Sequence, residues 1–122
     1  MENNADSSSL YSPSRRLEAE MLVLRLGVRA DLKGFDYLVD AVLLSDGGRN
    51  RICDIYDRIA AERRAKPKSV MRDISYAAYN APNLHRALSD MVGTNIAASD
   101  VHNALVIAYL GKILNFKSRE SE

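Results

Sequence analysis

The most informative stretch of this sequence is AAERRAKPKSVMRDISYAAY, residues 60–79. Four basic side chains, those of Arg63, Arg64, Lys66 and Lys68, surround Pro67 there. Apolar residues recur at helical spacing on both sides of this proline, which is tolerated in the first turn of a helix but not in its interior. The stretch therefore predicts two helices joined by a tight turn, a helix-turn-helix over about residues 51–81.

The same helical spacing extends over the rest of the chain. Apolar residues recur three and four positions apart, and no segment shows the sustained alternation that is typical of strands. Candidate caps begin three of the helices: Ser12, Asp31 and Ser99. The sequence predicts an all-α fold, a bundle of about six helices that contains the helix-turn-helix. We expect a single domain over residues 14–122, preceded by a disordered polar tail over residues 1–13.

One set of apolar residues is expected to be buried together, because it forms the stripes of three successive helices. These residues are Phe35, Leu38, Val42, Ile55, Ile59, Val70 and Ile74. The first helix repeats Leu17, Met21 and Leu24 at the same spacing.

Composition indicates an ordinary globular domain. The chain has 122 residues, of which 47% are apolar and 27% charged, as in soluble globular proteins. Cys53 is the single cysteine, so no disulfide can form within the chain and a reducing cytoplasm is the expected location. The longest apolar run, residues 104–111, is too short to span a bilayer, and the polar N-terminus is not a signal peptide. We expect no membrane partner.

Charge is distributed unevenly along the chain. The net charge is +1, but residues 49–72 hold eight basic residues against three acidic ones. A basic island in an otherwise mildly acidic chain favours an anionic partner, and a solvated helix face is the alternative. If the partner is double-stranded DNA, we expect phosphate contacts from Arg63, Arg64 and Lys66.

The helix after Pro67 offers a distinctive outer face. At 100° per residue, the side away from Val70 combines cationic, hydroxyl and aromatic groups: Lys68, Arg72, Ser75, Tyr76 and Tyr79. The second helix of a DNA-binding helix-turn-helix lies in the major groove. We therefore predict base contacts from Lys68, Arg72, Ser75 and Tyr76. An ordinary helical hairpin without DNA contacts is the alternative.

Three segments, taken in order, resemble a known family. They are LGVRADLKGFDYLVDAVLL (26–44), IYDRIAAER (55–63) and SVMRDISYAA (69–78). Their order and spacing resemble the DNA-binding effector domain of the sporulation-initiation response regulator of endospore-forming bacteria, over roughly residues 17–93. The resemblance implies a six-helix bundle with a helix-turn-helix. It also implies a bacterial transcription regulator that binds short DNA boxes, usually as tandem copies.

The resemblance assigns one role and contains several departures. Arg72 matches an arginine of the family's recognition helix that reads bases. Met71 stands where the family usually has glutamate and Ser75 where it has arginine, and the loop 93–99 lacks the family's lysine. No receiver domain precedes this region in the sequence. We therefore expect no switching by phosphorylation of a receiver aspartate in this chain.

Neither a catalytic nor a metal-binding motif accompanies these features. His85 and His102 are not at metal-ligand spacing, and no glycine-rich phosphate loop is present. We expect no enzyme activity, cofactor or small-molecule substrate. Two hypotheses remain: a DNA-binding transcription regulator, and a protein-interaction module that kept the fold and lost the DNA readout. The apolar last helix favours self-association in either case, as a homodimer or as tandem copies on DNA.

Overall fold

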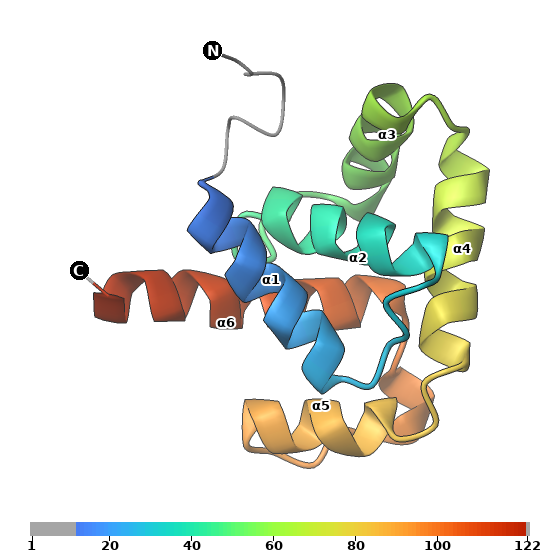
Figure 1. The fold of residues 1–122 in the computed structure, drawn as a ribbon. Helices are drawn as coiled ribbons and strands as arrows, with labels where there is room; N and C mark the ends of the chain where they lie inside the picture. Colours follow the sequence, from blue (N-terminus) through green and yellow to red (C-terminus); the bar gives the residue numbers. More distant parts are fainter. Residues whose placement is uncertain (1–11, 122) are drawn as a thin grey trace.

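The computed structural model describes the backbone of residues 12–121 and the side chains of residues 12–117. Six α-helices follow one another: α1 (Pro13–Arg25), α2 (Lys33–Leu44), α3 (Ile52–Arg63), α4 (Pro67–Tyr79), α5 (Leu84–Val92) and α6 (Asn103–Ser121), with a 3-10 turn, Ala98–Asp100, before α6. The described residues contain no strand. The predicted all-α fold of about six helices is confirmed (Figure 1).

The first helix begins as its sequence predicts. Ser12 is the N-cap of α1, and its hydroxyl accepts a hydrogen bond from the Arg15 backbone N–H at 3.1 Å. Pro13 occupies the first helical position, where no N–H is needed. The helix thus begins one residue inside the predicted tail, and residues 1–11 of that tail lie outside the described residues.

Two other predicted caps are wrong. The carboxylate of Asp31 binds Arg29 at 2.7 Å instead of capping α2, and this hydrogen bond lowers the pKa of Asp31. Ser99 lies in the 3-10 turn, so α6 starts later than predicted. The His102 ring is the group that caps α6, because its Nδ1 accepts from the Leu105 backbone N–H at 3.3 Å.

The central helix of the bundle is α2. It packs against α1, α3, α4 and α6, and nine of its 12 residues are buried. Figure 1 shows α2 crossing the middle of the molecule, with its first turn beside α4. Every residue of the set predicted to be buried together is buried. The apolar stripes of α2, α3 and α4 therefore form one core, as the sequence predicts.

The first helix carries two apolar stripes, and the fold buries only one of them. The buried residues of α1 are Ala19, Leu22 and Val23. The stripe that the helical spacing makes most obvious, Leu17, Met21 and Leu24, faces solvent. Periodicity alone cannot choose between two stripes on one helix, because both have the same spacing.

The helices α2 and α4 cross at Gly34. A Cβ atom placed on this residue would overlap the backbone carbonyl oxygen of Asp73 and lie 2.7 Å from the Cβ of Ala77. A backbone carbonyl cannot rotate away as a flexible side chain can. Gly34 therefore allows α4 to lie directly on the central helix.

We predict that Gly34→Ala lowers the free energy of unfolding by about 1–3 kcal/mol, because the added methyl group forces the two helices apart. The measurement is the denaturant midpoint at constant m-value. Lys33→Ala is the control, since Lys33 is exposed on the same turn and should change stability by less than about 0.5 kcal/mol. Equal stability of Gly34→Ala and the wild type would contradict the close crossing.

Candidate nucleic-acid interface

A three-residue connection, residues 64–66, joins α3 to α4. Arg64 adopts the left-handed conformation (φ 55°, ψ 48°), and the N–H of Ala65 donates to the Ala60 carbonyl at 2.9 Å. Lys66 is extended, and Pro67 begins α4. Helix-turn-helix motifs use turns of this length, which often contain glycine. Here Arg64 takes the left-handed conformation that glycine favours. The predicted arrangement over residues 51–81 is thus present as two helices and a tight turn.

One side of α4 faces the core and the opposite side faces solvent. Val70, Ile74 and Ala77 are buried. The predicted base-contacting residues Lys68, Arg72 and Tyr76 are exposed. Ser75 is exposed as well. The outward face that the sequence predicts therefore exists, but one of its members already has a partner within the fold.

That member is Ser75, which lies on the side of α4 next to the start of α6. Its hydroxyl accepts a hydrogen bond from the side-chain amide of Asn103, the first residue of α6, at 2.9 Å. The same amide donates to the hydroxyl of Tyr56 at 3.2 Å. Burial raises the pKa of Tyr56. Ser75 therefore helps to join α3, α4 and α6, a role that its place on α4 does not reveal.

Arg63 has a partner within the fold that the sequence does not predict. Its guanidinium donates two hydrogen bonds to the carboxylate of Asp40 on α2, at 2.8 and 3.0 Å. Asp40 is 8% exposed and also pairs with Arg16 of α1 at 3.1 Å. The hydrogen bonds to Asp40 raise the pKa of Arg63. The structure thus gives Arg63 a partner inside the fold, where the sequence predicts a phosphate contact.

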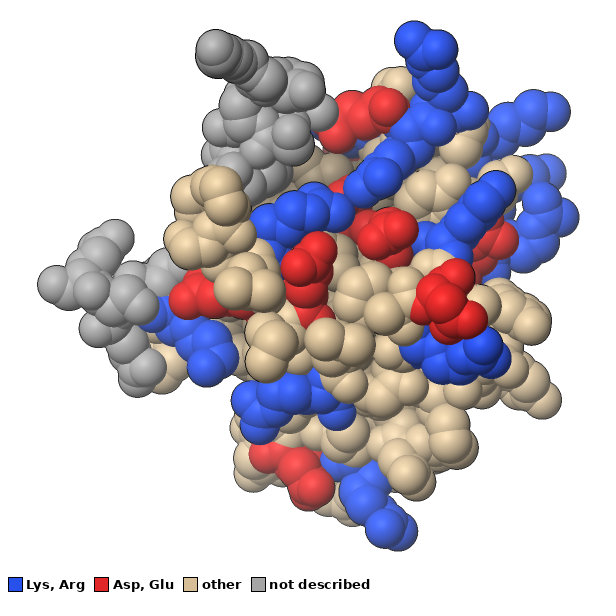
Figure 2. Space-filling model, viewed as in Figure 1, with Lys and Arg blue, Asp and Glu red and all other residues tan. Residues whose placement is uncertain are grey.

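The other basic residues of the turn are differently placed. Arg64, Lys66, Lys68 and Arg72 are all exposed, and none forms an ion pair within the described part of the chain. Figure 2 shows lysine and arginine side chains gathered at the upper right, where Figure 1 places the turn between α3 and α4. The turn and the start of α4 thus carry a group of four cations that are open to an anionic partner.

The residues that sequence reasoning missed come from distant parts of the chain. Asp40 and Asn103 both act on the helix-turn-helix, but they lie on α2 and α6. Neither belongs to a motif. The one available signal is that Asp40 is the only charged residue in the run YLVDAVLL, residues 37–44, because a buried carboxylate requires a partner.

Over the described residues, no helix is long and apolar enough to cross a membrane. The same residues contain no group of three or more His, Cys, Asp or Glu side chains that could hold a metal ion.

Comparisons with protein-family models, with curated proteins and with solved structures found no match to this chain.

We predict that Arg63→Ala lowers the free energy of unfolding by about 1.5–3 kcal/mol, the range for hydrogen bonds to charged groups. Arg58→Ala on the same helix is the control. Arg58 pairs with Glu62 in an exposed i, i+4 arrangement, and such pairs contribute less than about 0.5 kcal/mol. The measurement is urea unfolding of both variants. If the two losses are equal and small, the pair with Asp40 does not support the fold.

Proposed function

We propose that the chain is a DNA-binding transcription regulator, which contacts duplex DNA through α3, the turn at residues 64–66 and α4. It would act in the cytoplasm of a bacterium, like the sporulation-regulator effector domains that its sequence resembles. One observation carries the proposal: four cations without ion pairs in the described chain lie at the turn and on the outer side of α4.

The turn supplies the phosphate contacts. Arg64 and Lys66 lie beside the first turn of α4, which no described side chain caps. Unpaired backbone N–H groups at a helix start favour an anion, and nearby cations add to this attraction. A DNA phosphate is an anion of the right kind for this position.

The outer face of α4 supplies the base contacts. Arg72 lies one turn beyond Lys68, and Tyr76 one turn beyond Arg72, so the three form a single row. An arginine in the major groove can form two hydrogen bonds with guanine, and a lysine can bond the same acceptors. The hydroxyl and ring of Tyr76, 58% exposed, add a polar and an apolar contact.

We predict that Arg64→Gly weakens binding to all duplexes alike and lowers the slope of log affinity against log salt by about 0.9, the effect of one phosphate contact. Glycine favours the left-handed conformation of residue 64, so the melting temperature should be equal or higher. The measurement is duplex binding at several salt concentrations. Arg86→Ala is the control, since Arg86 is an exposed arginine of α5 outside the proposed interface.

We predict that Arg72→Ala acts on sequence preference instead. The preferred duplex would first be selected from random sequences with the wild-type chain. The variant should then lose about 1–3 kcal/mol of discrimination between that duplex and random DNA, with little change in its affinity for random DNA.

The proposal fails if the wild-type chain has no sequence preference and binds no tighter than the roughly 10⁻⁴ to 10⁻⁶ M of non-specific contacts. The protein-interaction module would then be the better hypothesis. One observation favours it: a hollow of about 570 Å³ lies beside α4, where Met71 and Tyr79 line it together with the start of α6.

A further inference from the structure

The large apolar side chains that the fold leaves exposed form two groups. Among the described residues, three lie on α4, the helix that we assign to DNA, and four lie on α1 and the end of α6. The α4 group is Met71, Tyr76 and Tyr79, and the other group is Leu17, Met21, Leu24 and Phe116. In Figure 1, α4 stands at the right edge of the molecule and α1 at its front and left. The proposed function leaves the second group without a role.

The exposed side chains of α1 form a continuous stripe. Leu17, Met21 and Leu24 follow one another at spacings of four and three residues, which places them on one side of the helix. Glu18 lies on one side of the stripe and Glu20 on the other, where Glu20 also pairs with Arg16 at 3.7 Å. A helix side of this composition is suited to an apolar surface with a basic rim.

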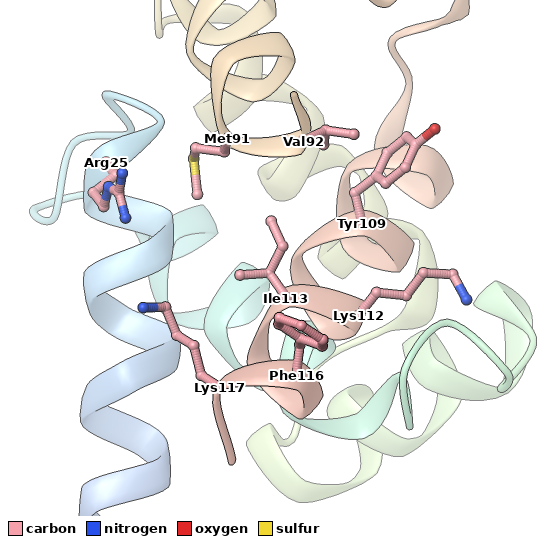
Figure 3. Close-up of a pocket in the computed structure, with 8 residues that line it drawn as sticks. All are labelled: Arg25, Met91, Val92, Tyr109, Lys112, Ile113, Phe116 and Lys117. Atoms are coloured by element: carbon pink, nitrogen blue, oxygen red, sulfur yellow. The ribbon is translucent and has the colours of Figure 1, made fainter. Parts of the chain in front are cut away.

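Such a surface lies next to α1 in the same molecule. A groove of about 480 Å³ opens between α1, α5 and α6. Figure 3 shows Met91 and Val92 of α5 above it and Ile113, Phe116 and Tyr109 of α6 along it. Its charged lining residues are all basic: Arg25, Lys112 and Lys117. The stripe and the groove are therefore complementary in charge, and both expose apolar groups.

The charges at the stripe are arranged so that two copies can satisfy them. Glu18 and Arg25 are seven residues apart, so they lie on the same flank of α1. Neither forms an ion pair within the described part of the chain. When two identical helices pack antiparallel about a two-fold axis, like flanks meet. Glu18 of each copy then faces Arg25 of the other, and each contact occurs twice.

We propose that a second copy of this chain covers the surface. The two α1 helices pack antiparallel with Met21 at the two-fold axis, and Leu17 of each copy lies at the mouth of the other copy's groove, beside Arg25. A helix stripe alone is small for a stable interface, which typically buries about 800 Å² per partner. The groove enlarges it. This dimer does not depend on DNA binding.

The test is the oligomeric state of the full chain in the absence of DNA, measured by sedimentation equilibrium over a concentration series. We expect a reversible monomer–dimer equilibrium. Met21→Gln should raise the dimer Kd about tenfold or more, because it removes the apolar contact at the axis. Met71→Gln is the matched control and should leave the Kd unchanged. The two methionines are similarly exposed, 52% for Met21 and 44% for Met71.

A charge exchange tests the antiparallel register. Glu18→Arg and Arg25→Glu should each weaken the dimer, because each places two like-charged pairs at the interface. The double variant Glu18→Arg/Arg25→Glu restores opposite charges and should recover most of the wild-type affinity. Recovery in the double variant also shows that both substitutions are compatible with the folded chain.

Two results would overturn the dimer. One is a chain that stays monomeric at every concentration up to its solubility limit, which would leave the groove to a different partner. The other is a dimer whose Kd responds neither to Met21→Gln nor to the charge reversals. Loss of sequence-specific DNA binding in the assays on α4 would count against the proposed function alone, because this measurement contains no DNA.

Discussion

The crossing of α2 and α4 at Gly34 is the constraint on which the rest of the structure depends. Four helices pack around α2, so its position is fixed by the core. The helix α4 rests directly on α2, where a side chain larger than hydrogen would meet the Asp73 carbonyl. This contact decides how far α4 stands out from the core. The outer face of α4 therefore has a fixed height and direction, which the proposed contact of α4 with a DNA groove would need.

A buried carboxylate fixes the other half of the helix-turn-helix. Asp40 receives Arg63 from the end of α3 and Arg16 from α1, so one side chain of the central helix joins three helices. The basic residues near the turn therefore differ in their partners within the described chain. Arg63 belongs to the scaffold, and its neighbours across the turn remain open to solvent. The pair of Arg63 with Asp40 holds the end of α3 in place, next to the turn that carries the exposed cations.

The two surfaces that we propose as contact sites lie on different parts of the molecule. The polar and aromatic face of α4 lies at one edge of the bundle, and the apolar stripe of α1 with its basic groove lies on another part of it. Both surfaces are open to solvent because α1 and α4 each pack against α2 with one side and expose the opposite side. Contact with a second copy through α1 would leave α4 exposed, so self-association and DNA binding are compatible in this arrangement.

The sequence by itself determined the helices, most of the core and the turn, because helical periodicity and Pro67 act locally. Core positions such as Leu38, Ile59 and Ile74 followed from spacing alone. The tertiary structure decided what depends on residues that are distant in the chain. It paired Arg63 with Asp40, drew Ser75 to Asn103, and turned Leu17, Met21 and Leu24 toward solvent. A cation looks the same in a sequence whether it binds a carboxylate or faces water, and two stripes of equal period look equally buried. Only the positions of the neighbouring helices distinguish them.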